Sequence, residues 1–387
     1  MKIAHYAKIL PSKKNSKFLR VGGLESSVIN LAKAQAKRHK VALLNSNNAL
    51  NLKIKKIFYY SITFNFLNIF FGNPLFKFIK VFGKPDIIII HEIYNFDIVP
   101  IILFSKAMRI KVYICPRGTL CPVALEVHKL KKVIYHKIIF QNIVKLINGF
   151  IALNKGEKSH IKKLFNKHTI FEIPNGINKD FFYLKKKSVI NSKLKNKRII
   201  IGYLGRYDFY IKGLDILLNE YSLYLDKSLK KSIQLVFIGQ HRSKHGYSSE
   251  TIIDNFNKVH KKNPIALNGP FYNKKKYREL LKFDILIQPS RSEGMPNTVL
   301  EAMSMGVPIA ATKETNILDI IKKSNSGWEI NHKLHNISNF FLKLENIKKK
   351  KILNYGLRGY KYSSDKLNIE SISDYSFKED RIRSYKY

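Results

Sequence analysis

The sequence predicts an α/β protein with two Rossmann-like domains, each built on a parallel sheet. Short, continuous apolar runs alternate with helical stretches in both halves of the chain, as expected for strands that are covered on both faces. A polar and charged segment at 182–197 separates the two halves. With 387 residues, 45% of them hydrophobic, the chain is long enough for two or three domains with sizeable cores.

The strand-like runs set the expected domain limits. They lie at 2–7, 41–46, 54–60, 86–91, 111–115, 149–153 and 170–174 in the first half, and at 198–204, 234–239, 264–267, 284–289 and 308–311 in the second. The clearest helical stretch spans 24–39. We therefore expect an N-terminal domain at 1–182, a linker at 183–197 and a C-terminal domain at 198–353. The remaining residues, 354–387, are basic, rich in tyrosine and without strand signals.

The composition indicates a basic, folded protein whose partners are anionic. Lys and Arg number 70 against 27 Asp and Glu, a formal charge of +43, which favours nucleic acid, anionic lipid or phosphorylated ligands. There is no helix-turn-helix, zinc-finger spacing or RNP-like strand, so nucleic-acid binding is the weaker alternative. No apolar run reaches the ~18 residues of a spanning helix, and no signal peptide is expected. Cys115 and Cys121 match no common zinc or redox spacing, and we expect reduced thiols in a cytosolic protein.

Two carboxylates stand eight positions apart in the run 284–311, DILIQPSRSEGMPNTVLEAMSMGVPIAA. Glu293 follows an apolar strand and lies in a loop, whereas Glu301 lies about one turn inside the helix that follows. Asn297 is the expected cap of that helix, and the N–H groups of Thr298, Val299 and Leu300 would attract phosphate. The spacing suits a sugar, a diphosphate and a ribose.

This pattern, E-G-x-P-N-x-x-x-E-A-M after a strand and before G-x-P, resembles the nucleotide-sugar signature of the retaining family 4 glycosyltransferases. The resemblance implies that Glu293 contacts the hydroxyl groups of the donor sugar and that Glu301 binds the ribose diol. The residues expected to bind the donor between and beside them are Gly294, Met295, Pro296, Asn297, Thr298 and Val299. It also implies the GT-B fold, with two Rossmann-like domains facing one another across a cleft, and a C-terminal helical tail that returns to the first domain.

Arg206 and Lys212 follow the strand at 198–204 and resemble the family's G-R-x5-K-G element. In that element both cations hold the donor diphosphate. A planar guanidinium and a compact ammonium can neutralise a leaving diphosphate without a metal. The chain contains no Asp-x-Asp, so we expect no metal and no cofactor.

The first domain offers a second group of candidates. Gly22 and Gly23 precede Glu25 at the start of a helix, similar to the family's G-G-x-E loop, where glycine lets the backbone approach phosphate. His91 and Arg117 follow strands and, together with Glu25, are expected on the acceptor or sugar side. Family members often carry His at the second of these positions, so the role of Arg117 stays open between binding an acceptor phosphate and pairing with a carboxylate.

The expected function is transfer of a hexosyl or N-acetylhexosaminyl group from a UDP- or GDP-sugar to a glycan acceptor, with retention of configuration. The basic surface and the aromatic segment 61–81 suggest an anionic membrane and a lipid-linked acceptor, as in bacterial O-antigen or capsule synthesis, on the inner face of the cytoplasmic membrane. The alternative is that the aromatic residues of segment 61–81 are ordinary core between two strands. A nucleotide-sugar epimerase or a phosphorylase of the same fold is the alternative enzyme.

Overall fold

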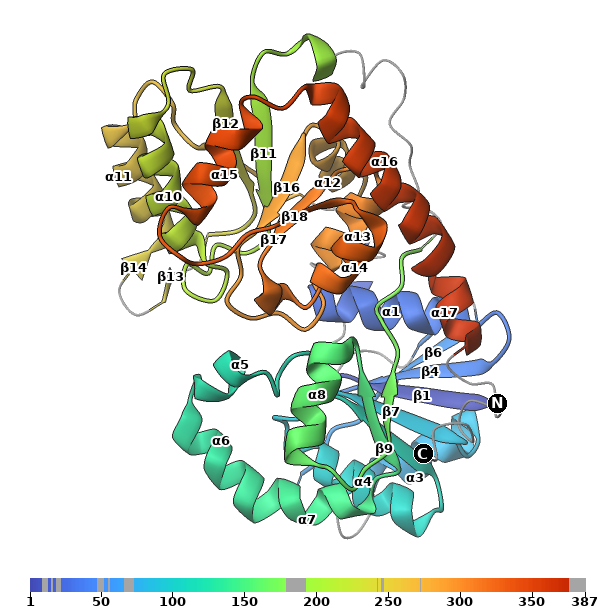
Figure 1. Cartoon of the computed structure of the whole chain (residues 1–387). Helices are drawn as coiled ribbons and strands as arrows, with labels where there is room; N and C mark the ends of the chain where they lie inside the picture. The colour runs from blue at the N-terminus through green and yellow to red at the C-terminus, as the bar shows by residue number, and fades with distance from the viewer. Residues whose placement is uncertain are drawn as a thin grey trace. The chain divides into compact units, whose positions relative to one another are not determined.

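The chain forms two compact units in the computed structural model (Figure 1). Unit 1 comprises Met1–Gly176 and Asn368–Tyr387, and unit 2 comprises Ile177–Leu367. The structure describes residues 1–8, 13–14, 17–18, 22–46, 52–54, 56–65, 73–178, 193–241, 243–244, 247–271 and 273–375. Most of the expected linker, 183–192, lies outside the described residues.

The core of unit 1 is an eight-stranded sheet in the order β10-β9-β8-β7-β1-β4-β6-β5. All neighbours are parallel except β5, which runs antiparallel to β6. The strands are β1 Lys2–Tyr6, β4 Lys40–Asn45, β5 Leu52–Ile54, β6 Ile57–Ser61, β7 Ile87–His91, β8 Lys111–Cys115, β9 Gly149–Ala152 and β10 Ile170–Glu172. The run at 54–60, expected as one parallel strand, is instead divided by a turn at Lys56 between the end of β5 and the start of β6.

Helices and short hairpin strands complete unit 1. They are β2 Lys13–Lys14, β3 Lys17–Phe18, α1 Gly23–Gln35, α3 Pro74–Phe82, α4 Ile98–Ala107, α5 Pro122–Glu126, α6 Lys129–Tyr135, the π-helix η1 His136–Phe140, α7 Gln141–Ile143, η2 Val144–Leu146, α8 Lys155–Leu164 and α17 Ile369–Tyr375. The expected helix at 24–39 is thus α1, which ends four residues earlier, at Gln35. Its buried side chains pack on β4, β6 and the end of β1.

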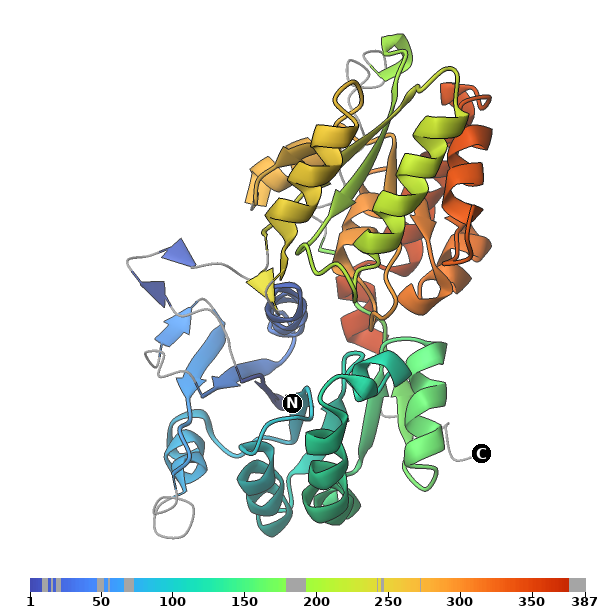
Figure 2. The same ribbon diagram turned by 90° about the vertical axis from the view of Figure 1, so that its left-hand side faces the viewer.

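Unit 2 contains a six-stranded parallel sheet in the order β15-β12-β11-β16-β17-β18, with helices on both sides (Figure 2). The strands are β11 Ile199–Leu204, β12 Ile233–Ile238, β15 Ala266–Asn268, β16 Ile285–Gln288, β17 Ile309–Ala311 and β18 Gly327–Glu329, with a separate hairpin of β13 Ser243–Lys244 and β14 Tyr247–Ser248. The helices are α10 Leu214–Lys227, α11 Ser249–Val259, α12 Asn273–Leu280, α13 Asn297–Ser304, η4 Lys313–Thr315, α14 Leu318–Ser324, α15 Asn336–Leu344 and α16 Lys349–Lys366. The sequence analysis missed β18, because three residues, GWE, give no strand pattern.

Two helices form the described end of the chain. The first, α16, begins at Lys349, inside the expected second domain, and packs on α13 within unit 2. A β-carbon at Gly356 would lie 2.1 Å from Gly306 O, so this close packing requires glycine. The second, α17, packs on α1 within unit 1, where Lys37 Nζ lies 2.5 Å from Glu370 Oε1. The expected tail at 354–387 is therefore divided between two helices that belong to different units, and 376–387 lie outside the described residues.

The strand order places the candidate residues at one point in each sheet. In unit 2 the strands that follow β11 in the chain, β12 and β15, lie on one side of it, and the strands that follow β16, β17 and β18, lie on the other side. The direction of winding therefore reverses between β11 and β16. In unit 1 the same reversal lies between β1 and β7. Ligands of such sheets bind beyond the carboxyl ends of the strands at this reversal. No helix in the described ranges has the length and apolarity needed to span a membrane.

Candidate functional site

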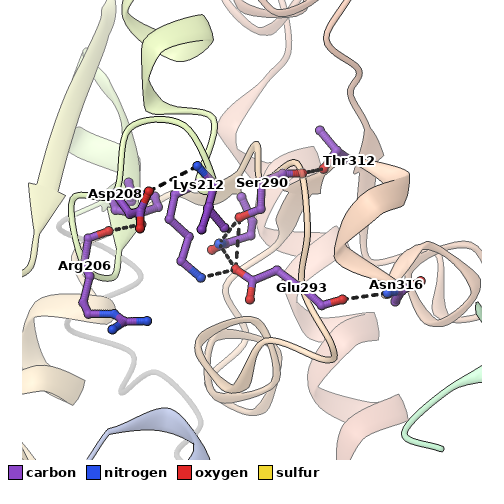
Figure 3. A network of polar contacts seen from close by, with 10 residues as sticks. Arg206, Asp208, Lys212, Ser290, Glu293, Thr312 and Asn316 are labelled. Carbon is purple, nitrogen blue, oxygen red and sulfur yellow. Dashed lines mark hydrogen bonds and ion pairs between the residues drawn. The ribbon is translucent and has the colours of Figure 1, made fainter. Parts of the chain in front are cut away.

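Glu293 is held by side chains from the loops after β11 and β16 (Figure 3). Its Oε1 atom accepts hydrogen bonds from Ser290 Oγ at 3.0 Å and Gln288 Nε2 at 3.1 Å, and Lys212 Nζ lies 2.5 Å away. The Lys212 and Glu293 side chains are only 17% and 14% exposed, so water screens this ion pair weakly. The structure thus brings together two of the residues that the sequence predicted.

The backbone of the Glu293 loop is fixed from the segment after β17. Glu293 N donates to Glu314 O at 3.0 Å, and Asn316 Nδ2 donates to Glu293 O at 2.7 Å. Thr312 Oγ1 donates to Ser290 O at 2.7 Å. A loop held on both sides in this way keeps its carboxylate in one place before any ligand arrives.

The Lys212 loop is fastened to the same strand end. Arg291 forms a two-pronged ion pair with Asp215, at 2.7 and 2.6 Å, and Arg291 N donates to Ile211 O at 2.9 Å. Gly213, with φ of +66°, passes so close to Pro289 that a β-carbon would lie 2.0 Å from the Pro289 carbonyl oxygen. The glycine of the K-G pair is therefore needed to bring Lys212 to Glu293.

Arg206 lies on the same loop but is exposed. Its carbonyl oxygen accepts from Tyr203 Oη at 2.8 Å and from Asp208 N at 2.9 Å, which fixes the backbone. Its guanidinium has no partner among the described residues and lies apart from the Lys212 and Glu293 pair (Figure 3). Of the two predicted cations, Lys212 is engaged by protein and Arg206 is available to a ligand.

Glu301 lies on α13 and is 8% exposed. Lys276 Nζ, from α12, donates to Glu301 Oε1 at 2.7 Å. Glu301 Oε2 is buried and has no hydrogen-bond partner among the residues that the structure describes. A buried carboxylate oxygen without a donor is costly, so this atom is set to accept a hydrogen bond from a ligand hydroxyl group.

The start of α13 differs from the expectation. The helix begins at Asn297 and its cap is Pro296, in extended conformation, so Asn297 does not cap the helix. The amides of Val299 and Leu300 donate to Pro296 O at 3.1 and 3.4 Å and are not open to phosphate. Of the three predicted amides, only that of Thr298 has no partner among the described residues. Gly294 and Met295 lie in the preceding loop, where Met295 is buried.

A second polar cluster lies in unit 1 at the reversal between β1 and β7. Arg117 Nε donates to His91 Nδ1 at 3.0 Å, His91 Nε2 lies 3.1 Å from His5 Nδ1, and His5 Nε2 lies 2.6 Å from Gln35 Oε1. An arginine only donates and an amide oxygen only accepts, so each histidine must be neutral, accepting one hydrogen bond at Nδ1 and donating one from Nε2. Arg117 Nη1 also donates to Asn175 Oδ1 at 3.0 Å.

Burial keeps both histidines of this row uncharged. It lowers the pKa of His5 to about 4, with a further lowering by Arg117 that the Gln35 hydrogen bond opposes. Burial, and then the Arg117 charge, also place the pKa of His91 well below its usual value. Arg117 itself is in the left-handed region, with φ of 55°, and is half-buried. The two histidines therefore hold the Arg117 guanidinium in place. Arg117 donates hydrogen bonds to His91 and Asn175, and its role on the acceptor side stays a prediction.

The start of α1 gathers acidic rather than basic side chains. The helix begins at Gly23 with Gly22 as its cap, and a β-carbon on Gly22 would lie 2.3 Å from Glu25 Oε2. Burial, and then the nearby Glu25 carboxylate, raise the pKa of Glu92, which Arg117 and Lys8 partly offset. Gly22 thus leaves room for the Glu25 side chain.

Several site residues were not foreseen. Gln288 and Ser290 were discoverable as polar residues at the end of an apolar strand, next to the predicted Glu293. Lys276 gave no signal among 70 basic residues. His5, Gln35 and Asn175 join the cluster only through strand order, which the sequence did not establish. No group of three or more His, Cys, Asp or Glu side chains in the described part of the chain could hold a metal ion.

Comparison with known proteins matches each half of the chain to a family of glycosyltransferases. Residues 21–181 match the family described as Glycosyltransferase Family 4, and residues 198–344 match Glycosyl transferases group 1. The capsular polysaccharide biosynthesis glycosyltransferase CapM of Staphylococcus aureus is 24% identical over 211 residues, which cover 53% of this chain and 48% of CapM. This chain matches about half the length of its curated relatives.

Solved structures share the fold. Anabaena HepE in complex with UDP and glucose aligns with a TM-score of 0.71 at 15% identity, covering 99% of this chain and 100% of that chain. WaaG, a glycosyltransferase involved in lipopolysaccharide biosynthesis, aligns with a TM-score of 0.65 at 14% identity, covering 97% of this chain and 98% of that chain. Two parallel-sheet domains of this kind define a GT-B protein.

The chain belongs to the glycosyltransferases that join a family 4 domain to a group 1 domain. The family resemblance and the fold class inferred from the sequence are thereby confirmed. The individual site residues remain predictions.

Proposed function

We propose that the protein transfers a sugar from a nucleotide-sugar donor to a glycan acceptor with retention of configuration. The observation that carries the proposal is the buried Oε2 atom of Glu301, which has no hydrogen-bond partner in the described part of the chain. Glu301 lies on α13, and Glu293 lies in the loop that precedes this helix. A ribose hydroxyl group would satisfy Glu301, and the donor sugar would lie at Glu293. The UDP and glucose of HepE, on the same fold, support a donor of this class.

Departure of the nucleotide would be assisted by fixed positive groups. The exposed Arg206 guanidinium suits a diphosphate, because its planar donors can bind two oxygens at once. Lys212 and the Thr298 amide would add a charge and a dipole on the same ligand. These groups need no metal, and we propose that transfer proceeds without a divalent cation or any cofactor.

Retention would follow from a front-face reaction. The bond between the anomeric carbon and the diphosphate oxygen breaks, the acceptor hydroxyl oxygen bonds to the same face, and its proton passes to the leaving diphosphate. Glu293 would hold the sugar hydroxyl groups, and the protein would act through position and electrostatics. In unit 1, Arg117 is the candidate group for an anionic acceptor.

The acceptor is proposed to be a lipid-linked glycan of a surface polysaccharide, used by a protein that is peripheral on the inner face of the cytoplasmic membrane. The formal charge of +43 supports an anionic surface as partner. The printed function of CapM, capsular polysaccharide biosynthesis, supports the class of product.

A donor panel tests this function. We expect one of UDP-glucose, UDP-galactose, UDP-N-acetylglucosamine and GDP-mannose to raise the melting temperature and, with acceptor, to release free nucleotide in the presence of EDTA. Release of nucleotide together with a glycosylated product separates transfer from epimerisation, and independence of inorganic phosphate separates it from phosphorolysis. Stabilisation by none of these donors or by their nucleotides would contradict the proposal.

A further inference from the structure

An amphipathic surface of unit 1 has no partner in the described structure. The helix formed by α6 and η1 carries Leu130, Ile134 and Ile138, which are 73%, 49% and 66% exposed. Residues spaced by four lie above one another on the same side of a helix. These three side chains therefore form one apolar stripe, to which Val133, 41% exposed, adds.

The stripe is not needed by the core of unit 1. The opposite side of the same helix already supplies Tyr135 and Phe140, which are buried in that core. Tyr135 Oη also donates to Ile93 O at 2.7 Å, which ties the helix to the segment after β7. A helix that is apolar on both sides and buried on only one has a second surface to cover.

Phe96 extends the stripe into a groove. This residue, in the segment before α4, is 69% exposed, and its ring meets that of Tyr135 edge to face at 5.8 Å. A groove of about 470 Å³ lies between them. Its lining residues are Tyr94, Phe96, His128, Lys131, Lys132, Ile134 and Tyr135.

Basic side chains frame the stripe. Lys129, Lys131 and Lys137 are exposed, and Glu126 is the single acidic residue between positions 122 and 146. Lys132 makes a cation–π contact with Tyr94, with its Nζ 4.8 Å from the ring centre. Apolar side chains set among lysines are typical of helices that lie in the headgroup region of an anionic bilayer.

We infer that the surface formed by Phe96, Leu130, Val133, Ile134 and Ile138 docks on an anionic lipid bilayer, with Lys129, Lys131 and Lys137 on its headgroups. The inference rests on the proposed membrane partner but not on sugar transfer. It also relocates the contact that the sequence suggested at 61–81. Residues 66–72 of that segment lie outside the described residues. In the described part, Leu75 and Phe78 are buried, and Phe76 and Val81 are the exposed large apolar side chains.

Flotation with vesicles tests the surface on the full chain. Phosphatidylcholine vesicles with and without phosphatidylglycerol are compared at low and high salt. Wild type should float with the anionic vesicles at low salt only. The variant L130S/I134S/I138S and the variant K131E/K137E should each lose at least about tenfold in affinity for them.

Matched controls lie on unit 2 and preserve the type of change. Leu229 and Val259 are isolated apolar residues at 102% and 77% exposure, and L229S/V259S should bind as wild type. K261E/K262E repeats the charge reversal on exposed lysines. A loss in either control equal to that in the matching α6 variant would overturn the inference, because binding would then depend on overall charge or apolarity and not on this surface.

A fluorescent label reports insertion directly. Cys115 and Cys121, the two cysteines of the chain, are buried, so I138C provides the accessible thiol. A polarity-sensitive dye on I138C should shift to the blue on anionic vesicles, while the same dye on L229C should not. No shift at position 138 in a protein that floats would place the contact elsewhere.

Two further measurements distinguish membrane docking from self-association and from loss of donor binding. Light scattering before and after the triple substitution detects a second copy of the chain on the stripe. A wild-type dimer that becomes monomeric while vesicle binding persists would overturn the inference in favour of self-association. Nucleotide binding by the triple variant should equal that of wild type, so failure of docking and failure of donor binding are distinguishable.

Discussion

Lys212 Nζ lies 2.5 Å from Glu293 Oε1, an oxygen that also accepts hydrogen bonds from Gln288 and Ser290. One oxygen of the candidate sugar-binding carboxylate is therefore committed to the protein, and a cation expected on the diphosphate is tied to it. In this arrangement, changes at either residue must alter the other.

A double-mutant cycle measures that coupling. We expect K212M and E293Q each to lower the free energy of unfolding, because each leaves the other charge without its partner in a weakly screened place. The double variant should be more stable than additivity predicts, by on the order of 1 kcal/mol. Urea unfolding of the four proteins provides the measurement. Strict additivity would mean that the ion pair has no role in holding the loop.

Arg206 should matter for turnover rather than stability. Its guanidinium has no partner in the described structure, so R206A removes a ligand contact and leaves the fold intact. We expect kcat to fall by about a hundredfold or more, the usual effect of losing one preorganised donor. R278A removes an exposed arginine from the same unit and should leave kcat unchanged. Near wild-type turnover by R206A would exclude Arg206 from the diphosphate site.

Arg117 should act on the acceptor. Its fork reaches His91 and Asn175 together, which the single ammonium group of lysine cannot reproduce. R117K should raise KM for the acceptor while the Kd of the nucleotide donor stays constant. Steady-state kinetics and calorimetric titration separate the two quantities. A weaker donor affinity with an unchanged acceptor KM would assign Arg117 to the donor side.

The neutral histidine row predicts a pH dependence of stability. Because burial lowers the pKa of His5 from 6.5 to about 4, the unfolded chain takes up a proton in this range before the folded chain does. Stability is therefore complete above pH 6.5 and decreases as the pH falls to about 4, by about 3 kcal/mol for a shift of this size.

The H5Q variant isolates this effect from the carboxylates. The difference in unfolding free energy between wild type and H5Q should change with pH between 6.5 and 4 and be constant above that window. Urea unfolding at a series of pH values gives the difference. A difference that does not change with pH would show that His5 is protonated equally in both states.

Sequence patterns predicted the parts of this structure that depend on local chemistry. The apolar runs predicted the strands that precede Arg206 and Glu293, and the Glu-x7-Glu spacing predicted a loop carboxylate and a helix carboxylate in one unit. Patterns failed where a single residue decides the geometry. Pro296, rather than Asn297, caps α13: its backbone is extended and its carbonyl accepts from the amides of Val299 and Leu300. A turn at Lys56 divides the run at 54–60.

Contacts between distant segments were beyond the sequence. His5 and His91 meet because β1 and β7 are neighbours, and Gln35 reaches His5 from α1. Local periodicity does not predict strand order. Lys276 reaches Glu301 from another helix and looked like any other lysine. The stripe on α6 was also missed, because an apolar helix residue reads as core until its exposure is known.

The ribose contact of Glu301 tests the account most directly. Calorimetric titration compares the best nucleotide with its 2′,3′-dideoxy analogue on wild type and on E301A. Wild type should bind the dideoxy analogue about tenfold to a hundredfold more weakly, the effect of lost hydrogen bonds to a charged group, and E301A should not distinguish the two. Equal binding of both nucleotides by wild type, or an undiminished preference in E301A, would contradict the donor site proposed for unit 2.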